Sequence, residues 1–225
     1  MWNILLQIDS SKAGALVAAE SESLWSVLMK GGMLMIPLFG LMAIAVYFFI
    51  ERLLVIRKAS AGDENFMRII RDNIVSGNIT AARNLARNTQ NPVARVIDKG
   101  IQRIGKPIDI IEKSMDNVGV LEMYALEKNL SVLSLIARIA PLFGFLGTII
   151  GMLSLFKGIA ATSEYTPNTI ADGIYIKMIT SATGLIIGML TYLGYSYLLA
   201  QIARIENRID AASSEFMDIL QEPTR

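Results

Sequence analysis

Three long apolar stretches without a single charged residue dominate the pattern of the chain. They cover residues 31–50, 139–156 and 178–203, and charged residues flank each of them. Each stretch is long enough to cross the roughly 30 Å hydrocarbon layer of a membrane as an α-helix, which rises about 1.5 Å per residue. The pattern therefore predicts three transmembrane helices, which with their flanking residues lie at 31–50, 138–157 and 176–203.

The residues that follow the first apolar stretch are charged and predict its end. Glu51, Arg52, Arg57 and Lys58 come directly after it, and we expect them to stop the first helix. They open a polar domain over residues 51–137, in which apolar residues recur at helical spacing and no run alternates with period two. We expect this domain to be helical, with no strand, and its charges to form a solvated face.

Capping residues divide the polar domain into predicted helices. Asp63 can cap a helix that Gly77 closes, and either Asn78 or Thr80 can open the next one. Asn91 precedes a proline, which is the expected order for a cap followed by the first residue of a helix.

Two longer helices are expected, one before the second apolar stretch and one after the third. The helix before the second stretch has no helix breaker before Pro141, and its apolar face comprises Ile111, Met115, Val118, Leu121 and Ala125. The tail, residues 204–225, is expected to continue the third span as one long helix that projects into solvent. Its packing stripe comprises Ile205, Ile209, Ala212, Phe216 and Ile219.

Composition narrows the possible functions. Hydrophobic residues make up 53% of the chain and the mean hydropathy is +0.47, which fits several membrane spans. The net charge of +1 provides no strongly basic surface for nucleic acid. The chain has no cysteine and no histidine, which removes thiolate chemistry, the commonest general base and the commonest transition-metal ligand. We therefore expect no metal site, no cofactor and no enzymatic activity.

Basic residues near the spans set the expected orientation. They follow the first and third spans, whereas the link at 158–175 contains none. By the positive-inside rule, the domain 51–137 and the helix 204–225 are cytoplasmic, and the link is periplasmic. The N-terminal segment 1–30 is expected to be retained on the periplasmic side, where residues 23–30 form either a short interfacial helix or a disordered tail.

The second and third spans carry glycines at a spacing typical of packed membrane helices. Gly147 and Gly151 form a GxxxG pair in the second span, with Gly144 one turn earlier. Gly184 and Gly188 repeat this spacing in the third span. Small residues on one face let helix backbones approach closely in lipid. The two spans are therefore expected to pack tightly within a multi-helix assembly.

Hydroxyl residues and one lysine are the candidate lining of an ion pathway. Thr148, Thr180 and Ser181 lie toward the outer half of the membrane in the expected orientation, where they can face one another. Each hydroxyl can instead return a hydrogen bond to the carbonyl one turn earlier. Lys177 stands at the outer end of the third span, where it can line the pathway or extend its ammonium to the interface.

The apolar stretches contain no Asp, Glu or His. A proton relay in hydrocarbon normally needs a titratable group, so a partner would have to supply the acid. Two classes of function stay open at this point. One is an ion-conducting assembly that a partner completes, and the other is a structural membrane scaffold with no ion pathway.

Two stretches of the sequence resemble the MotA/TolQ/ExbB proton-channel family. They are APLFGFLGTIIGM at 140–152 and GIYIKMITSATGL at 173–185. The three-span layout with an insert after the first span is similar to ExbB and TolQ, and the Gly31-Gly32 pair and the run FIER at 49–52 are similar to ExbB. The resemblance extends from about Leu24 to the C-terminus.

This resemblance implies an all-helical homopentamer around a central pore in the bacterial inner membrane. It also implies a single-span, ExbD-like partner whose membrane aspartate carries the proton. The complex would use proton-motive force to drive a TonB-like protein that energises outer-membrane transport. In this comparison Thr148 and Ser181 fall on the family's hydroxyl positions in the second and third spans, with Thr148 facing the pore. Membrane lipids are expected to surround the assembly.

One position departs from the family. Many ExbB proteins have a glutamate in the third span where this chain has Ile176, followed by Lys177. This position therefore has no proton-binding group, which leaves the partner's acid as the sole carrier and leaves sodium as an alternative to the proton. Lys177 can instead pair with an acid on the partner. A TolQ-like or gliding-type stator would use the same ion-driven mechanism to move a different load, and the sequence does not distinguish between these loads.

Overall fold

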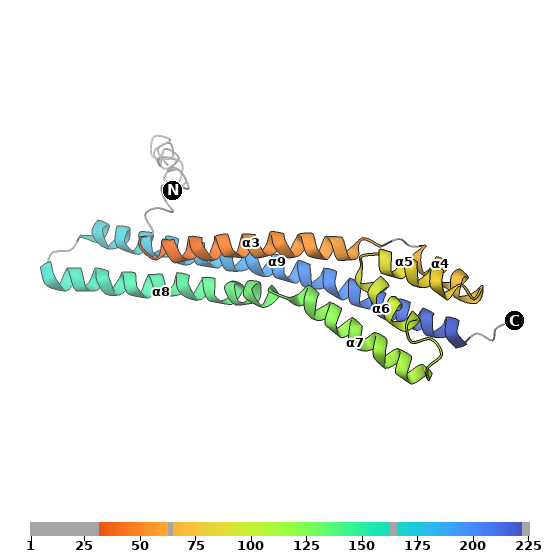
Figure 1. The fold of residues 1–225 in the computed structure, drawn as a ribbon. Coiled ribbons are helices and arrows are strands. Elements are labelled where there is room, and N and C mark those ends of the chain that lie inside the picture. The colour runs from red at the N-terminus through yellow and green to blue at the C-terminus, as the bar shows by residue number, and fades with distance from the viewer. Residues whose placement is uncertain (1–31, 63–64, 163–165, 222–225) are drawn as a thin grey trace, which may run out of the picture. The chain divides into compact units, whose positions relative to one another are not determined.

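The structure is a computed structural model that describes residues 32–62, 65–162 and 166–221. All regular elements in these ranges are α-helices (Figure 1). In chain order they are α3 (Met35–Ser60), α4 (Phe66–Val75), α5 (Ile79–Asn88), α6 (Pro92–Ile101), α7 (Ile108–Glu127), α8 (Leu130–Thr162) and α9 (Pro167–Gln221). The prediction of an all-helical chain is confirmed for this part. The N-terminal segment 1–30 and the predicted cap Asp63 lie outside the described residues.

Three of these helices are long and apolar enough to cross a membrane. The apolar candidates are Met35–Ser60, Leu130–Ala161 and Gly173–Gln221, with mean hydropathies of 2.1, 2.0 and 1.5. Large apolar side chains on them are exposed, including Leu142, Phe145 and Leu153 at 60% or more. An exposed apolar surface of this kind is unfavourable in water and fits a lipid environment. The expected number of spans is therefore confirmed by length and composition.

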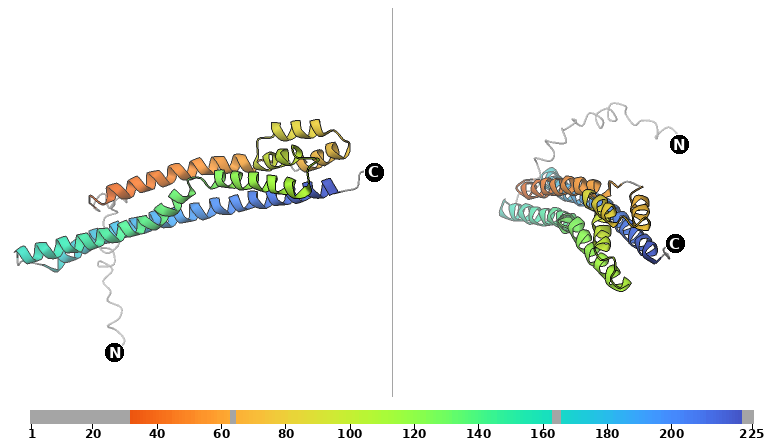
Figure 2. Two further views of the ribbon diagram at one scale, coloured as in Figure 1. Left: turned by 60° about the horizontal axis from the view of Figure 1, so that its bottom comes forward. Right: turned by 45° about the vertical axis from the view of Figure 1, so that its right-hand side comes forward.

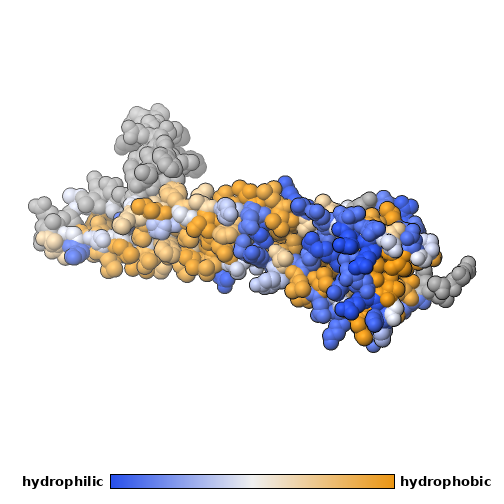
Figure 3. Space-filling view, viewed as in Figure 1, coloured by the Kyte–Doolittle hydropathy of each residue, from blue (hydrophilic) through white to orange (hydrophobic). Residues whose placement is uncertain are grey.

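Contacts divide the chain into two compact units. Unit 1 comprises residues 1–39 and 141–186, and unit 2 comprises residues 40–140 and 187–225. Within unit 1, α8 and α9 run side by side, as the further views in Figure 2 also show. Within unit 2, the short helices α4, α5 and α6 carry much of the hydrophilic surface visible in Figure 3.

The core of unit 2 forms where the short helices pack on α7 and α9. Its fully buried side chains include Ile70 of α4, Ile97 of α6, Met115 of α7 and Phe216 of α9. Gly100 of α6 allows this packing, because a Cβ added there would lie 2.6 Å from both Met115 Sδ and Phe216 Cε1. The predicted stripe on the tail is confirmed, since Ile205, Ile209, Ala212, Phe216 and Ile219 are all buried. The third span and the tail also form one helix, as expected.

Two helix boundaries differ from the expectation. Glu51 and Arg52 do not end the first helix, because α3 continues to Ser60. Charged residues end a membrane span without ending a helix when the next turns can pack on a soluble domain, and here Ile56 is buried in the core of unit 2.

The second difference is a break that the sequence reading missed before Pro141. Helix α7 ends at Glu127, and Asn129 adopts a φ of 65° before α8 begins at Leu130. Asparagine tolerates this left-handed conformation better than most residues, so it permits the turn. Pro141 lies inside α8 and does not end it. The expected apolar face is also wrong at Leu121, which is 66% exposed, and at Ala125, which is exposed as well. Helix α7 instead buries Ile111, Met115, Gly119 and Leu126.

The predicted caps at Asn78 and Asn91 are confirmed. Asn78 Oδ1 accepts a hydrogen bond from Ala81 N at 3.2 Å, and Asn91 Oδ1 accepts one from Ala94 N at 2.7 Å. Gly77 has a φ of +77° directly after α4, as expected for a glycine that closes a helix.

The buried cap gives a first prediction. Asn91→Ala should lower the free energy of unfolding by about 1–2 kcal/mol, because it removes the acceptor for Ala94 N at a site where water has little access. Thermal unfolding of the detergent-solubilised chain measures this effect. Asn84→Ala is the control, since Asn84 is exposed in the middle of α5 and should cause no comparable loss. Equal stability of Asn91→Ala and wild type would contradict the assigned cap.

Candidate functional site

The glycines of α8 lie directly against α9 in unit 1. A Cβ added at Gly144 would lie 3.0 Å from Ser181 O and 3.1 Å from both Ser181 Cα and Thr180 O. One turn further along α8, a Cβ added at Gly147 would lie 2.7 Å from Thr180 Cγ2. The backbone of α8 therefore touches the backbone of α9 at the first glycine and a threonine methyl at the second. Only glycine allows this approach.

The contact between α8 and α9 continues beyond these residues, and the two helices run in opposite directions along it. Gly151 faces the side chain of Lys177, and a Cβ added at Gly173 would lie 2.8 Å from Leu155 Cδ1. As the residue numbers rise on α8, their neighbours on α9 fall, so the two helices are antiparallel. Gly144, Gly147 and Gly151 thus occupy one face of α8, as their spacing predicts.

The positions on α9 that contact Gly144 and Gly147 are not glycines. Gly184 and Gly188 are buried, but Thr180 and Ser181 are the residues that lie opposite Gly144. Thr180 is only 1% exposed, and its methyl group fills the space left by Gly147. The structure therefore places Thr180 inside the α8–α9 interface of a single chain.

Several hydroxyl groups in these helices donate to the backbone of their own helix. Thr148 Oγ1 donates to Phe145 O at 2.6 Å, Thr183 Oγ1 to Ile179 O at 2.8 Å and Thr191 Oγ1 to Ile187 O at 2.7 Å. This is the alternative role that the sequence left open. A hydroxyl whose proton is used in this way still has lone pairs on its oxygen. Such a group can accept a hydrogen bond from water or a protonated carrier.

Thr148 and Ser181 are both partly buried in unit 1. Thr148 lies one turn after Gly144 on α8, and the backbone of Ser181 contacts the Gly144 position. Thr148 follows Gly147 on α8 and Ser181 follows Thr180 on α9, so both residues are next in sequence to a pair that is in contact. Lys177 lies one turn away from Ser181 on α9, against Gly151. The side chain of Ile176 lies outside the described part of the chain.

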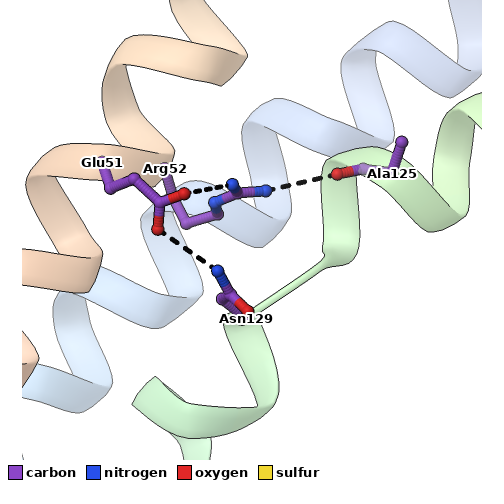
Figure 4. Close-up of polar contacts among 4 residues, drawn as sticks. All are labelled: Glu51, Arg52, Ala125 and Asn129. Carbon is purple, nitrogen blue, oxygen red and sulfur yellow. Dashed lines mark hydrogen bonds and ion pairs between the residues drawn. The ribbon is translucent and has the colours of Figure 1, made fainter.

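A second polar site in unit 2 was missed by the sequence reading. It lies where α3 passes the junction of α7 and α8, and Figure 4 shows its four residues. Arg52 Nη1 donates to Ala125 O at 3.2 Å, and Arg52 Nη2 is 2.6 Å from Glu51 Oε1. Asn129 Nδ2 donates to Glu51 Oε2 at 3.3 Å. From the sequence, Arg52 was expected only to end the first span and to mark its cytoplasmic side, but the residue is buried, with 5% exposed.

This cluster connects α3 to the break between α7 and α8. Arg52 donates to a carbonyl in the last turn of α7, where helix carbonyls lack partners within their own helix. Glu51 binds Asn129, the residue with positive φ that forms the break. The spacing of Ala45, Arg52 and Ile56 on one buried face of α3 was the available sequence signal, because seven and four residues both return to the same side of a helix.

The fold and the site together define a helical membrane protein in which two glycine-rich spans form a close, hydroxyl-bearing interface. The chain belongs to the MotA/TolQ/ExbB proton channel family, whose pattern matches residues 88–211, more than half of its length. The resemblance noted in the sequence is thereby confirmed. The family is one of proton channels and not of enzymes, in agreement with the expected function class.

Named relatives are similar to this chain at low identity. A biopolymer transport ExbB homologue of Methanothermobacter thermautotrophicus is 28% identical over 172 residues, which cover 75% of this chain and 60% of that protein. Biopolymer transport protein exbB1 of Vibrio cholerae is 44% identical over 69 residues, or 30% of each chain. The Tol-Pal system protein TolQ of Pseudomonas aeruginosa is 30% identical over 95 residues, which cover 42% of this chain and 41% of that protein.

These matches cover less than two thirds of each relative's length. Proteins named ExbB and TolQ both appear among them, so the comparison assigns the family without separating these two branches.

Proposed function

We propose that this chain is the multi-span subunit of an ExbB-like, proton-driven motor in the bacterial inner membrane. Five copies would surround a single-span, ExbD-like partner, and the complex would energise a TonB-like protein that serves outer-membrane transport. The observation that supports this proposal best is the α8–α9 interface. In a chain of a proton-channel family, it combines close glycine packing with the hydroxyl groups of Thr148 and Ser181.

The side chains in the spans indicate which groups this chain would supply and which the partner would supply. The stretches 139–156 and 178–203 supply hydroxyl oxygens but no carboxylate, so they can accept hydrogen bonds and cannot carry a proton by themselves. The titratable group would be an aspartate in the membrane helix of the partner. The membrane potential contributes about 2.3 kcal/mol for each charge moved across 100 mV, which sets the energy available per proton.

The proposed topology follows from the distribution of basic residues. The domain 51–137 and the helix 204–225 would lie in the cytoplasm, and the link 158–175 would lie in the periplasm, because the link contains no lysine or arginine. The first span would use residues 31–50 and the others 138–157 and 176–203. Insertion of reporter domains after each span tests this arrangement.

Removal of both hydroxyls tests the proposed conduction. The double variant Thr148→Val and Ser181→Ala should reduce proton-dependent activity at least tenfold, because it removes the polar atoms that line the interface without adding volume. Activity is measured as proton flux into vesicles that contain the full complex. The mass of the purified complex should stay unchanged.

Thr191→Val is the matched control, because Thr191 is a buried threonine of α9 that bonds its own helix and lies in unit 2. It should retain flux close to that of wild type. Wild-type flux in the double variant would contradict a conducting interface and would favour a structural scaffold instead.

A second candidate differs only in the load. The similarity to a TolQ protein favours a TolQ-like or gliding-type stator in which the same ion-driven complex moves a different partner. Purification of the tagged chain from its native membrane separates the two, because the co-purifying periplasmic partner identifies the load. Flux assays in sodium and in sodium-free buffer decide between the two ions.

A further inference from the structure

The side chain of Lys177 lies across Gly151 in the α8–α9 interface. A Cβ added at Gly151 would overlap Cγ, Cδ and Cε of Lys177, so the lysine stem occupies the place of the missing side chain. Gly151 is buried and Lys177 is partly buried. Thr180 packs on Gly147 on one side of this contact, and Leu155 packs on Gly173 on the other. The lysine is thus held within the helix interface and not at its end.

The position of this contact along α8 places it inside the apolar layer. Gly151 lies six residues before Lys157, the first charged residue after the stretch 139–156. Six residues of an α-helix correspond to about 9 Å. The stem of Lys177 packs on the neighbouring helix α8 at Gly151.

Among the described residues, no carboxylate forms an ion pair with Lys177. The stretches 139–156 and 178–203 contain no carboxylate, and residues 32–39 at the start of α3 are also uncharged. Asp172 is the acidic residue that precedes Lys177 in α9, and its side chain lies outside the described part of the chain. Charged groups inside membranes usually pair with one another, so the anion is expected from outside this chain.

We propose that Lys177, seated on Gly151, binds a carboxylate on a membrane helix of another chain. This inference rests on the proposed function, because the carboxylate would belong to the same single-span partner. The pairing gives the lysine a specific role. The ion pair holds the partner's acid in its ionised form, and it breaks when the carboxylate takes up a proton from water and becomes neutral.

Retention of the partner tests the proposal. The tagged full-length chain is co-expressed with a single-span protein that carries an aspartate in its membrane helix, and the amount of partner that co-purifies is measured. Lys177→Met should reduce retention at least tenfold, and replacement of the partner's membrane aspartate by asparagine should do the same. The combination of both changes should cause little further loss, because each change removes the same ion pair.

Two glycine variants separate the lysine seat from general packing. Gly151→Ala should also reduce retention, because its Cβ displaces the lysine stem. Gly158→Ala is the matched control in the same helix, since no atom lies within 4 Å of its Cβ position, and it should retain the partner fully. The amount of each variant in the membrane shows whether it folds.

Partner retention by Lys177→Met within twofold of wild type would overturn the inference and leave the proposed function intact. This result is expected if Lys177 binds a lipid headgroup instead. The effect of Lys177→Met on the complex would then depend only on the content of anionic lipid in the membrane. Failure of the wild-type chain to retain the partner would overturn the inference and the proposed function together.

Discussion

Gly144→Val should prevent α8 and α9 from packing and should leave little assembled complex in the membrane. The three atoms nearest to the Cβ position of Gly144 all belong to the backbone of Thr180 and Ser181, at 3.0–3.1 Å. A side chain in that place could rotate away, but the backbone of a continuous helix cannot. The two helices must therefore separate, which also loosens the contacts at Gly147 and Gly151.

The cost of this change is at least about 3 kcal/mol, at the upper end of the usual range for overpacking. Thermal unfolding and the mass of the detergent-purified chain measure it. Gly158→Val in the same helix is the control, because Gly158 is exposed and its Cβ position has no neighbour within 4 Å. A Gly144→Val variant that melts and assembles like Gly158→Val would show that the helices do not approach at this glycine.

Arg52→Met is expected to destabilise the chain by about 2 kcal/mol. The change removes the donor to Ala125 O and leaves Glu51 without its cation (Figure 4). Loss of one partner of a fully buried ion pair costs about 3–5 kcal/mol. The value here is smaller, because the Glu51 side chain is 32% exposed and water can solvate it. Asn129 also continues to donate to its second carboxylate oxygen.

Urea-induced unfolding of the solubilised chain measures this loss. Arg57→Met is the control, since Arg57 is exposed on the same helix and should change stability by less than about 0.5 kcal/mol. Arg52→Lys should fall between the two, because a lysine keeps the charge but cannot donate to Glu51 and Ala125 in the fixed geometry of a guanidinium. Equal stability of the Arg52 and Arg57 variants would show that the buried cluster does not stabilise the helix junction.

The sequence predicted the elements whose signals are local. The caps at Asn78 and Asn91 and the glycine after α4 follow from the hydrogen bonds and backbone angles that single residues favour. The tail stripe from Ile205 to Ile219 follows from helical periodicity. These features need no knowledge of the rest of the fold, which is why one sequence was sufficient.

The features that the sequence did not predict depend on contacts between distant residues. The break at Asn129 is stabilised by Glu51, far away in the sequence, and neither residue signals the other. The burial of Arg52 has the same cause, because its carbonyl acceptor belongs to α7.

In the candidate site, residue type identified the glycine face of α8. The relative axial shift of two antiparallel helices is determined along their whole interface. That shift places Thr180 and Ser181, and not Gly184, opposite Gly144.

Helix α9 runs without interruption from Pro167 to Gln221, and this continuity restricts which insertions and deletions the protein tolerates. Each residue of an α-helix advances the side-chain direction by about 100°, so one inserted residue between Thr180 and Ile205 would turn one face away from its neighbours while the other stayed in place. Insertions of seven or eleven residues nearly restore the angle, but they lengthen the rod by whole turns. Length variation among homologues should therefore be rare in α9 and should concentrate in the loops between the short helices.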